Sequence, residues 1–413
     1  MSGGIYGLIG GKLGHSLSPE IHRLLGRADY RLFELAPGDL PAFLSRGDIG
    51  GLNVTIPYKT EAMKYCTPSP LAAEIGAVNT LVARDGRLFG YNTDPYGFLY
   101  LAERAGISFA GRKTVILGSG GASKTVAYCA KTQGAREIAV ISRSGEDNYT
   151  NLAKHADAEI LVNCTPVGMF PDCGTSPVDL SVFPALSAVI DLIYNPRLTK
   201  LLSDAKERGI KTAGGLRMLV AQAKRSAELF SGEKIPDGEI ENTVRAVSLS
   251  SFNIVLTGMP GSGKTAVGRA LAKMTGRVLL DTDEEVEKLD GRPAGLIIEE
   301  EGEEAFRRLE SAAVRAAGSR TGVIIATGGG VVTRPENKLP LRQNGRVYEI
   351  RRPLGELETA GRPLSAGPGG PGKLLAERGA AYESFRDALI MNDGTPEEAA
   401  ERIWRDYLEN TGD

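Results

Sequence analysis

Short apolar runs alternate with amphipathic stretches along the chain, and this pattern predicts layered α/β structure. Between residues 5 and 92 the apolar runs are IYGLIG, YRLFEL, GLNVTI and NTLVA, with helical spacing between them, which indicates an open α/β layer. The pattern restarts at Lys113 with TVILGSGGASKTVAYCAKTQGAREIAVISRS. This segment has a buried strand, a glycine turn, a periodic helix and a second strand. It is a complete βαβ unit and predicts a nucleotide-binding domain.

The later pattern predicts how the domains are arranged. Strand-like runs follow at 159–163 and 188–192, and LRMLVAQAKRSAELF then has helical spacing and is expected to pack back on the first domain. After a polar stretch at 248–251, FNIVLTGMPGSGKTAVGRALA predicts a new strand, loop and helix. We therefore predict an α/β substrate domain (1–96 and 216–247) split around a Rossmann-like domain (97–215). A linker (248–251) and a P-loop domain with a parallel sheet (252–413) follow.

Composition narrows the function to small-molecule chemistry. The 413 residues carry 49 basic and 51 acidic side chains, so no strong field favours a nucleic acid or a membrane surface. Four cysteines without a CxxC pair and three histidines predict neither a disulfide framework nor a zinc site. The sequence has no basic segment followed by a long apolar run, and no apolar run of membrane-spanning length. We therefore expect a cytoplasmic protein, and the oligomeric state is not predicted.

A glycine turn in the βαβ unit predicts a dinucleotide site. GSGGAS stands between strand and helix, where backbone N–H groups can approach a pyrophosphate. The next strand ends in a guanidinium flanked by hydroxyls rather than in an acidic residue, which favours the 2′-phosphate of NADP over NAD. An exposed surface arginine is the alternative. The residues predicted for NADP(H) are Gly118, Ser119, Gly120, Gly121, Ala122, Ser142, Arg143 and Ser144.

The segment from Gly258 to Thr265 matches the pattern GxxxxGK[ST] in full, after the apolar run NIVLT and before a helical run. Such a loop cradles phosphates with its N–H groups, the lysine neutralises phosphate charge, and the Thr265 hydroxyl is a ligand for Mg²⁺. The loop predicts a nucleotide but no acceptor. The residues predicted for ATP here are Gly261, Ser262, Gly263, Lys264, Thr265 and Ala266.

An ordered set of motifs resembles the shikimate dehydrogenase family across residues 5–247: GHSLSP, NVTIPYK, GAVNT, YNTD, GSGGAS, NCTPVGM, DLIYNP and GLRMLVAQA. The resemblance implies that Lys59 transfers the proton and that Asp94 is its partner at the reacting oxygen. It implies substrate contacts at Ser16, Ser18, Thr55, Lys59, Asn79, Asp94, Tyr194 and Gln222. It also places Thr165 and Gly215 at the nicotinamide. Ser18, which precedes a proline, is alternatively a helix cap.

A second set resembles the shikimate kinase family across about 252–395: LLDTDEEVE, GEEAFRRLE, ATGGG, GRPL and ERGAAYES. The resemblance implies that Asp283 contacts the ring hydroxyls and assists deprotonation, and that Asp281 lies near Mg²⁺ through water. It implies substrate contacts at Arg307, Gly329 and Arg378, and a lid arginine, Arg362, over ATP. The lid before Arg362 is shorter than usual in the family, and residues 365–373 form a glycine-rich loop. A solvated helix N-terminus is the alternative for DTD.

Together the two resemblances imply reduction of 3-dehydroshikimate by NADPH, followed by phosphorylation of shikimate by ATP. Two alternatives keep the kinase but change the first half. In one, the first half is a quinate dehydrogenase that uses NAD; in the other, it is a non-catalytic regulatory domain that binds a nucleotide.

Overall fold

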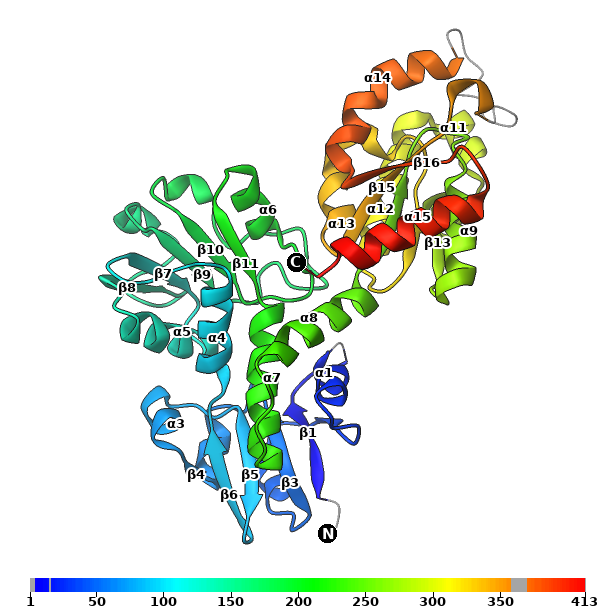
Figure 1. The fold of residues 1–413 in the computed structure, drawn as a ribbon. Coiled ribbons are helices and arrows are strands. Elements are labelled where there is room, and N and C mark those ends of the chain that lie inside the picture. Colours follow the sequence, from blue (N-terminus) through cyan, green and yellow to red (C-terminus); the bar gives the residue numbers. More distant parts are fainter. Residues whose placement is uncertain (1–3, 15, 358–369, 413) are drawn as a thin grey trace. The chain divides into compact units, whose positions relative to one another are not determined.

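Figure 1 shows the computed structural model, which describes residues 4–14, 16–357 and 370–412. The chain forms two compact units: residues 1–169 with 175–247, and residues 248–413 with 170–174. The first unit contains two sheets and the second contains one. The predicted α/β class is confirmed. Among the residues that the structure describes, no helix is both long and apolar enough to cross a membrane.

The N-terminal sheet has the order β2-β1-β3-β5-β6-β4. Its first three strands are parallel, β5 is antiparallel to both β3 and β6, and β4 is parallel to β6. The β5–β6 turn contains Asp85 and Gly86, both with positive φ (50° and 72°), as a tight hairpin requires. The strands are β1 (Ile5–Gly10), β2 (Arg31–Glu34), β3 (Ile49–Val54), β4 (Thr67–Pro68), β5 (Thr80–Arg84) and β6 (Arg87–Tyr91); the helices are α1 (Ser18–Leu24), α2 (Leu40–Leu44) and α3 (Pro70–Ile75).

The second sheet of this unit is fully parallel, with the order β11-β10-β9-β7-β8. In β7, Val115 and Leu117 pack into one apolar cluster and Ile116 into another, as expected for a parallel strand covered on both faces. The predicted βαβ unit is β7–α5–β8. The elements are β7 (Lys113–Leu117), β8 (Glu137–Ile141), β9 (Ile160–Asn163), β10 (Ala188–Asp191), β11 (Lys211–Gly214), α4 (Asp94–Arg104), α5 (Gly121–Thr132) and α6 (Lys200–Glu207).

Helix α7 (Leu216–Ser231) and most of helix α8 (Gly238–Ser251) close the first unit, and the residues of α8 from Ser248 onward belong to the second. Helix α7 packs on the N-terminal sheet, because a Cβ at Gly51 of β3 would lie 2.3 Å from the Phe230 ring. The helix expected to return to the first domain therefore does so. Residues 248–251, expected as a separate linker, are instead the last turn of α8.

The second unit has one parallel sheet with the order β13-β14-β12-β15-β16. Residues 370–373, expected in a glycine-rich loop, begin helix α14 instead; Arg362 and residues 365–369 lie outside the described residues. The strands are β12 (Asn253–Thr257), β13 (Leu279–Asp281), β14 (Ile324–Ala326), β15 (Gly345–Arg351) and β16 (Ala388–Met391). The helices are α9 (Lys264–Thr275), α10 (Thr282–Asp290), α11 (Ala294–Glu301), α12 (Glu303–Gly318), α13 (Lys338–Arg342), α14 (Gly370–Phe385) and α15 (Pro396–Asn410).

Candidate active sites

A lysine–carboxylate pair forms the centre of the first candidate site. Lys59 follows β3 and Asp94 begins α4, and Lys59 Nζ donates to Asp94 Oδ2 at 2.5 Å. Asn79 Nδ2 donates to the other carboxylate oxygen, Asp94 Oδ1, at 2.8 Å. The Asp94 side chain is 8% exposed and that of Lys59 is 19% exposed. The lysine therefore presents its ammonium group at the edge of a buried, hydrogen-bonded carboxylate.

The other predicted substrate residues divide into two groups. Gln222 joins the pair, because its Oε1 accepts from Asn79 Nδ2 at 3.4 Å. Within the described residues no hydrogen bond links the remaining four to the pair: Ser16, Ser18, Thr55 and Tyr194. Thr55 lies directly after β3, and Tyr194 packs beside an apolar cluster of α1, α7 and α8, where burial raises its pKa.

Ser18 does not cap α1 with its side chain, so that alternative is wrong. The N-cap residue is Leu17 and Ser18 is the first helical residue. Instead Ser16 Oγ accepts from Ser18 N at 3.2 Å. The proline after Ser18 allows it to start the helix, since proline is favoured in the first turn.

The glycine turn between β7 and α5 lies beside the lysine. Gly118 has φ +103°, and a Cβ there would lie 3.2 Å from Thr165 Cγ2, so this position requires glycine and brings Thr165 to the turn. A Cβ at Gly121 would lie 3.8 Å from Lys59 Cδ. Helix α5 begins after Gly120 without a side-chain cap. Its first N–H groups therefore suit a pyrophosphate.

The predicted 2′-phosphate residues follow β8. Arg143 and Ser144 are exposed and Ser142 is half-buried. Ser142 N donates to Asp147 O at 3.1 Å, which closes the loop that contains Arg143. Gly215, predicted at the nicotinamide, is the N-cap residue of α7; a Cβ there would lie 2.1 Å from Leu192 O. Packing alone therefore requires glycine at this position.

The P-loop of the second unit joins β12 to α9. Gly258, Gly261 and Gly263 all have positive φ (141°, 83° and 91°), a region that side chains rarely adopt. Lys264 Nζ donates to Gly258 O at 2.9 Å and to Met259 O at 3.0 Å. The lysine is thus held by the loop whose phosphate it is expected to contact.

The predicted magnesium residues contact one another. Thr265 Oγ1 donates to Asp281 Oδ2 at 2.9 Å, and Asp281 Oδ1 accepts from Asp283 N at 3.0 Å at the start of α10. Asp281 is therefore the N-cap of α10, in agreement with the alternative that the DTD sequence begins a helix. It contacts the P-loop threonine as well. Hydroxyl and carboxylate oxygens suit Mg²⁺, which completes its shell with water and phosphate oxygens. The part of the chain that the structure describes has no cluster of three His, Cys, Asp or Glu side chains for a metal.

The predicted kinase substrate residues surround the glycine triplet 328–330. A Cβ at Gly330 would lie 2.1 Å from Arg307 Nη1. Gly329 O accepts from Arg378 Nη1 at 3.3 Å. A Cβ at Gly328 would lie 2.7 Å from Asp283 Oδ1. The triplet thus brings together Asp283, Arg307 and Arg378, and a side chain at Gly328 or Gly330 would displace Asp283 or Arg307.

Two residues of this site were missed by the sequence analysis. Glu310 is fully buried and its Oε2 accepts from Arg307 Nη1 at 2.7 Å, and Tyr382 OH donates to Gly329 O at 2.5 Å. Helical spacing could have found both, because Glu310 is three residues after Arg307 and Tyr382 four after Arg378.

Carboxylates in this site are shifted toward their protonated forms. Partial desolvation of the Asp283 carboxyl, with the Asp281 charge, raises the pKa of Asp283 although the residue is exposed, while Lys264 and Arg307 oppose this shift. Burial also raises the pKa of Glu310, and Arg307 again opposes the shift. A raised pKa makes Asp283 a better proton acceptor, which is useful beside a hydroxyl group.

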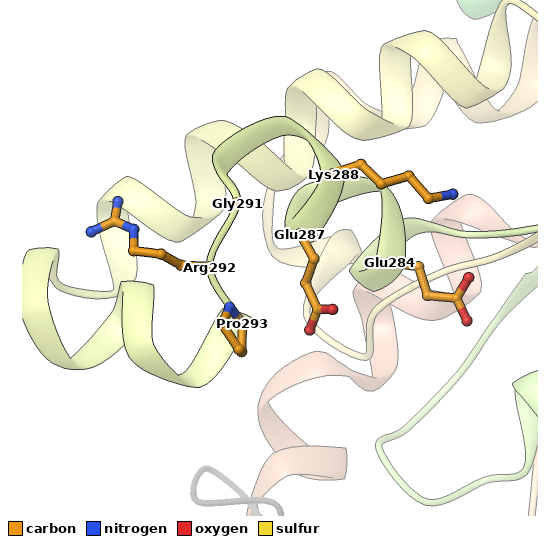
Figure 2. Close-up of a pocket in the computed structure, with 6 residues that line it drawn as sticks. All are labelled: Glu284, Glu287, Lys288, Gly291, Arg292 and Pro293. Atoms are coloured by element: carbon orange, nitrogen blue, oxygen red, sulfur yellow. The ribbon is translucent and has the colours of Figure 1, made fainter.

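A separate pocket of about 450 Å³ lies at the end of α10 and the following loop. Figure 2 shows its lining residues, with Arg292 extending away from the two glutamates. None of them is a predicted site residue, although Glu284 directly follows Asp283. They are Glu284, Glu287, Lys288, Gly291, Arg292 and Pro293.

Comparisons with known proteins match both parts of the chain. Residues 8–81 match the model of the shikimate dehydrogenase substrate binding domain, and residues 260–407 match that of shikimate kinase. The NADP(+) shikimate dehydrogenase of Clostridium perfringens is 36% identical over 260 residues, which are 58% of this chain and 96% of that protein. Both predicted resemblances are confirmed.

Solved structures match the first unit. A chorismate mutase/shikimate 5-dehydrogenase fusion protein from Clostridium acetobutylicum is 39% identical, with a TM-score of 0.57 over 60% of this chain and 97% of that one. Shikimate 5-dehydrogenase from Thermus thermophilus, in complex with NADP(H) and shikimate, is 33% identical, with a TM-score of 0.54 over 59% and 99%. Quinate dehydrogenase from Corynebacterium glutamicum, in complex with NAD, is 29% identical, with a TM-score of 0.54 over 59% and 99%. The chain therefore belongs to the shikimate dehydrogenase family and carries a shikimate kinase domain after it, as a fusion of the two modules.

Proposed function

We propose that this chain catalyses two consecutive reactions, reduction of 3-dehydroshikimate to shikimate with NADPH and phosphorylation of the shikimate 3-hydroxyl with ATP. The observation that carries the proposal is the presence of two formed sites in one chain, the Lys59–Asp94 pair and the Arg307–Asp283 cluster beside a P-loop. The product of the first reaction is the substrate of the second. Near-balanced charge supports small-molecule substrates, and a cytoplasmic location is part of the proposal.

In the first reaction, bound NADPH would supply the hydride. Lys59 would donate a proton to the oxygen that becomes the new hydroxyl, because its Nζ uses one N–H on Asp94 and has others for the substrate. Asn79 and Gln222 would bind ring hydroxyls next to this pair. The N–H groups at the start of α5 would hold the pyrophosphate, and Arg143 the 2′-phosphate.

In the second reaction, the P-loop and Lys264 would hold the ATP phosphates, and Thr265 and Asp281 would hold Mg²⁺, which supplies charge stabilisation at the transferring phosphoryl group. Asp283 would accept the hydroxyl proton. Arg307 would bind the substrate carboxylate. Three of its five N–H groups already bond to Glu303 and Glu310, which leaves two in a fixed orientation.

Two alternatives for the first unit are less well supported. The likeness to a quinate dehydrogenase with NAD favours a different substrate and cofactor, but the guanidinium of Arg143 between two serines favours NADP. A non-catalytic regulatory domain would need no lysine in contact with a buried carboxylate, and this contact is formed.

The experiment that tests the proposal is an assay of the whole chain with 3-dehydroshikimate, NADPH, ATP and Mg²⁺, in which NADPH loss and ADP formation are followed separately. We expect ADP only when NADPH is present, and we expect added shikimate to restore ADP formation without NADPH. NADPH that stays constant while added shikimate is phosphorylated would refute the dehydrogenase assignment.

Three variants in the same assay separate the sites. Lys59→Ala should abolish ketone reduction and leave shikimate phosphorylation unchanged, and Lys264→Ala should do the reverse. Comparable loss of both activities in either variant would refute two independent sites. Arg143→Ala should raise KM for NADPH far more than KM for NADH; an equal rise would refute the 2′-phosphate assignment.

A further inference from the structure

We infer that Ser226 of helix α7 is a positioning residue for the reduction, because its hydroxyl fixes the side chains that hold the Asn79 amide against Asp94. The inference rests on the proposed dehydrogenase function and extends it to a residue that, within the described part of the chain, forms no hydrogen bond with the proton donor Lys59. A continuous network of buried hydrogen bonds supports it.

The orientation of the Asn79 amide is fixed by a backbone donor. Thr93 N donates to Asn79 Oδ1 at 2.8 Å, and a backbone N–H can only donate. The Asn79 oxygen must therefore face Thr93, and its NH₂ group must face Asp94 Oδ1, 2.8 Å away. A flipped amide would set two donors against each other at Thr93 and two acceptors at Asp94. This orientation leaves Asp94 Oδ2 for Lys59 Nζ.

Ser226 supports Asn79 through two neighbouring side chains. Its Oγ lies 2.8 Å from Thr80 Oγ1, and Thr80 Oγ1 donates to Asn79 Oδ1 at 2.9 Å. Asn53 Nδ2 donates to Ser226 Oγ at 2.8 Å and to the backbone oxygen of Asn79 at 3.2 Å. The Ser226 hydroxyl thus contacts two side chains that each contact Asn79.

The same hydroxyl reaches the start of α4. Ser226 Oγ lies 3.2 Å from Thr93 Oγ1, and Thr93 precedes Asp94. Ser226 Oγ also lies 3.0 Å from Gln222 O, one turn earlier on the same helix. Helix α7 is therefore connected, through one side chain, to β3, β5 and the residue before the predicted catalytic carboxylate.

Burial makes this network sensitive to a single deletion. The fully buried residues are Thr80 and Ser226, both 0% exposed, and Asn53, Asn79 and Thr93 are at most 5% exposed. Water has little access, so a donor or acceptor that loses its partner stays unpaired or rearranges. The rearrangement would change the position of Asn79 and, through it, of Asp94 and Lys59. A displacement at the proton donor affects the transition state more than substrate binding.

The test is Ser226→Ala in the whole chain, assayed for shikimate oxidation with NADP⁺. We expect kcat to fall about tenfold while KM for shikimate and Kd for NADP⁺ change less than about twofold. Ser231→Ala is the matched control, because it removes a hydroxyl from the same helix that, among the residues described, bonds only to Ala227 O at 3.0 Å and to Glu233 N at 3.1 Å. It should leave kcat unchanged.

A double variant tests whether Ser226 acts through Asn79. In an Asn79→Ala background, Ser226→Ala should cost less than about twofold in kcat. An equal loss in both backgrounds, or an unchanged kcat in the single variant, would overturn the inference. If Ser226→Ala does not fold, Thr80→Val replaces it, because valine has nearly the shape of threonine and lacks the hydroxyl between Ser226 and Asn79. This variant must also lower kcat while KM for shikimate stays nearly unchanged. An unmodified chain without turnover would overturn the proposed function and this inference together.

Discussion

At the scale of single residues, His22 connects the stability of the first unit to pH. It is 1% exposed, its ring stacks on Tyr30 at 4.0 Å, and within the described residues its Nδ1 has no hydrogen-bond partner. Burial lowers the pKa of His22 to about 3, while Asn53 opposes this shift and Arg27 adds to it. The folded state therefore keeps His22 neutral, and the unfolded chain takes up a proton below its ordinary value of 6.5.

The sign of the effect follows from this difference. Above pH 6.5 the neutral His22 makes its full contribution to the free energy of unfolding. This contribution is lost as the pH falls toward 3, since the unfolded state then binds more protons. We predict that His22→Phe, which keeps a ring against Tyr30, reduces the loss of unfolding free energy between pH 7 and pH 5 by about 2 kcal/mol. The measurement is urea unfolding of the whole chain at pH 7 and pH 5, with and without the substitution, followed by far-ultraviolet circular dichroism.

Asp191 changes the free energy of unfolding with pH in the opposite direction to His22. Its effect must be the same in the unmodified chain and in the His22→Phe variant. Burial raises the pKa of Asp191 to about 6, while bonds from Thr199, Ile193 N and Asn163 oppose this. The contribution of Asp191 to the free energy of unfolding therefore grows as the pH falls through 6. Both chains in the experiment carry Asp191, so its effect is common to them. The same loss of stability between pH 7 and pH 5 in the His22→Phe variant would contradict the prediction.

Residues differ in how well the sequence predicts their roles. The Lys59–Asp94 pair and the Thr265–Asp281 contact join residues that motifs identify, and the structure brings both pairs within hydrogen-bonding distance. No sequence motif identifies Ser226, because a serine in an amphipathic helix commonly lies on its solvent-exposed face. Its partners come from β3, β5 and the start of α4, and only the folded chain brings them together.

At the scale of elements, both sites lie where strands end and helices begin. The β7–α5 turn, the P-loop and the β13–α10 junction all follow parallel strands, and this arrangement could be predicted from alternating strand and helix patterns around glycine motifs. The end of α8 could not. Ser248, Ser250 and Ser251 suggest a loop, but Tyr407 OH donates to Leu249 O at 3.1 Å and Leu249 packs on an apolar cluster. These long-range contacts stabilise the last helical turn.

The loop of the glycine triplet gives a prediction at this scale. Gly330→Ala would set a methyl group against Arg307, whose guanidinium cannot easily move because Glu303 and Glu310 hold it. We expect KM for shikimate to rise at least about tenfold, with KM for ATP changed less than about twofold. Steady-state kinase kinetics measure both values.

Gly295→Ala is the matched control for this variant. Gly295 lies in α11, and nothing lies within 4 Å of a Cβ at that position, so its kinetics should equal those of the unmodified chain. If Gly330→Ala raised KM for ATP as much as KM for shikimate, the triplet would belong to the nucleotide site instead.

At the scale of the whole molecule, each unit has apolar clusters of its own. In the first unit they cover the faces of two sheets, and in the second they cover both faces of one. The single tryptophan, Trp404, lies on α15 of the second unit, where it stacks on Tyr407 at 5.4 Å. Its fluorescence therefore reports the unfolding of the second unit within the intact chain.

This placement allows ligands to be assigned to units by mass action. A ligand that binds only folded protein stabilises the unit that holds it, by about 2.7 kcal/mol at a hundredfold excess over Kd. We predict that ADP with Mg²⁺ and shikimate raises the urea midpoint of Trp404 fluorescence, and that NADP⁺ leaves that midpoint unchanged while it raises the midpoint of dehydrogenase activity loss. Chelation of Mg²⁺ should remove most of the first effect, because Thr265 and Asp281 then have no ion to share with the nucleotide. A rise in the Trp404 midpoint with NADP⁺ would mean that the two units unfold as one, and the assignment of separate stabilities would fail.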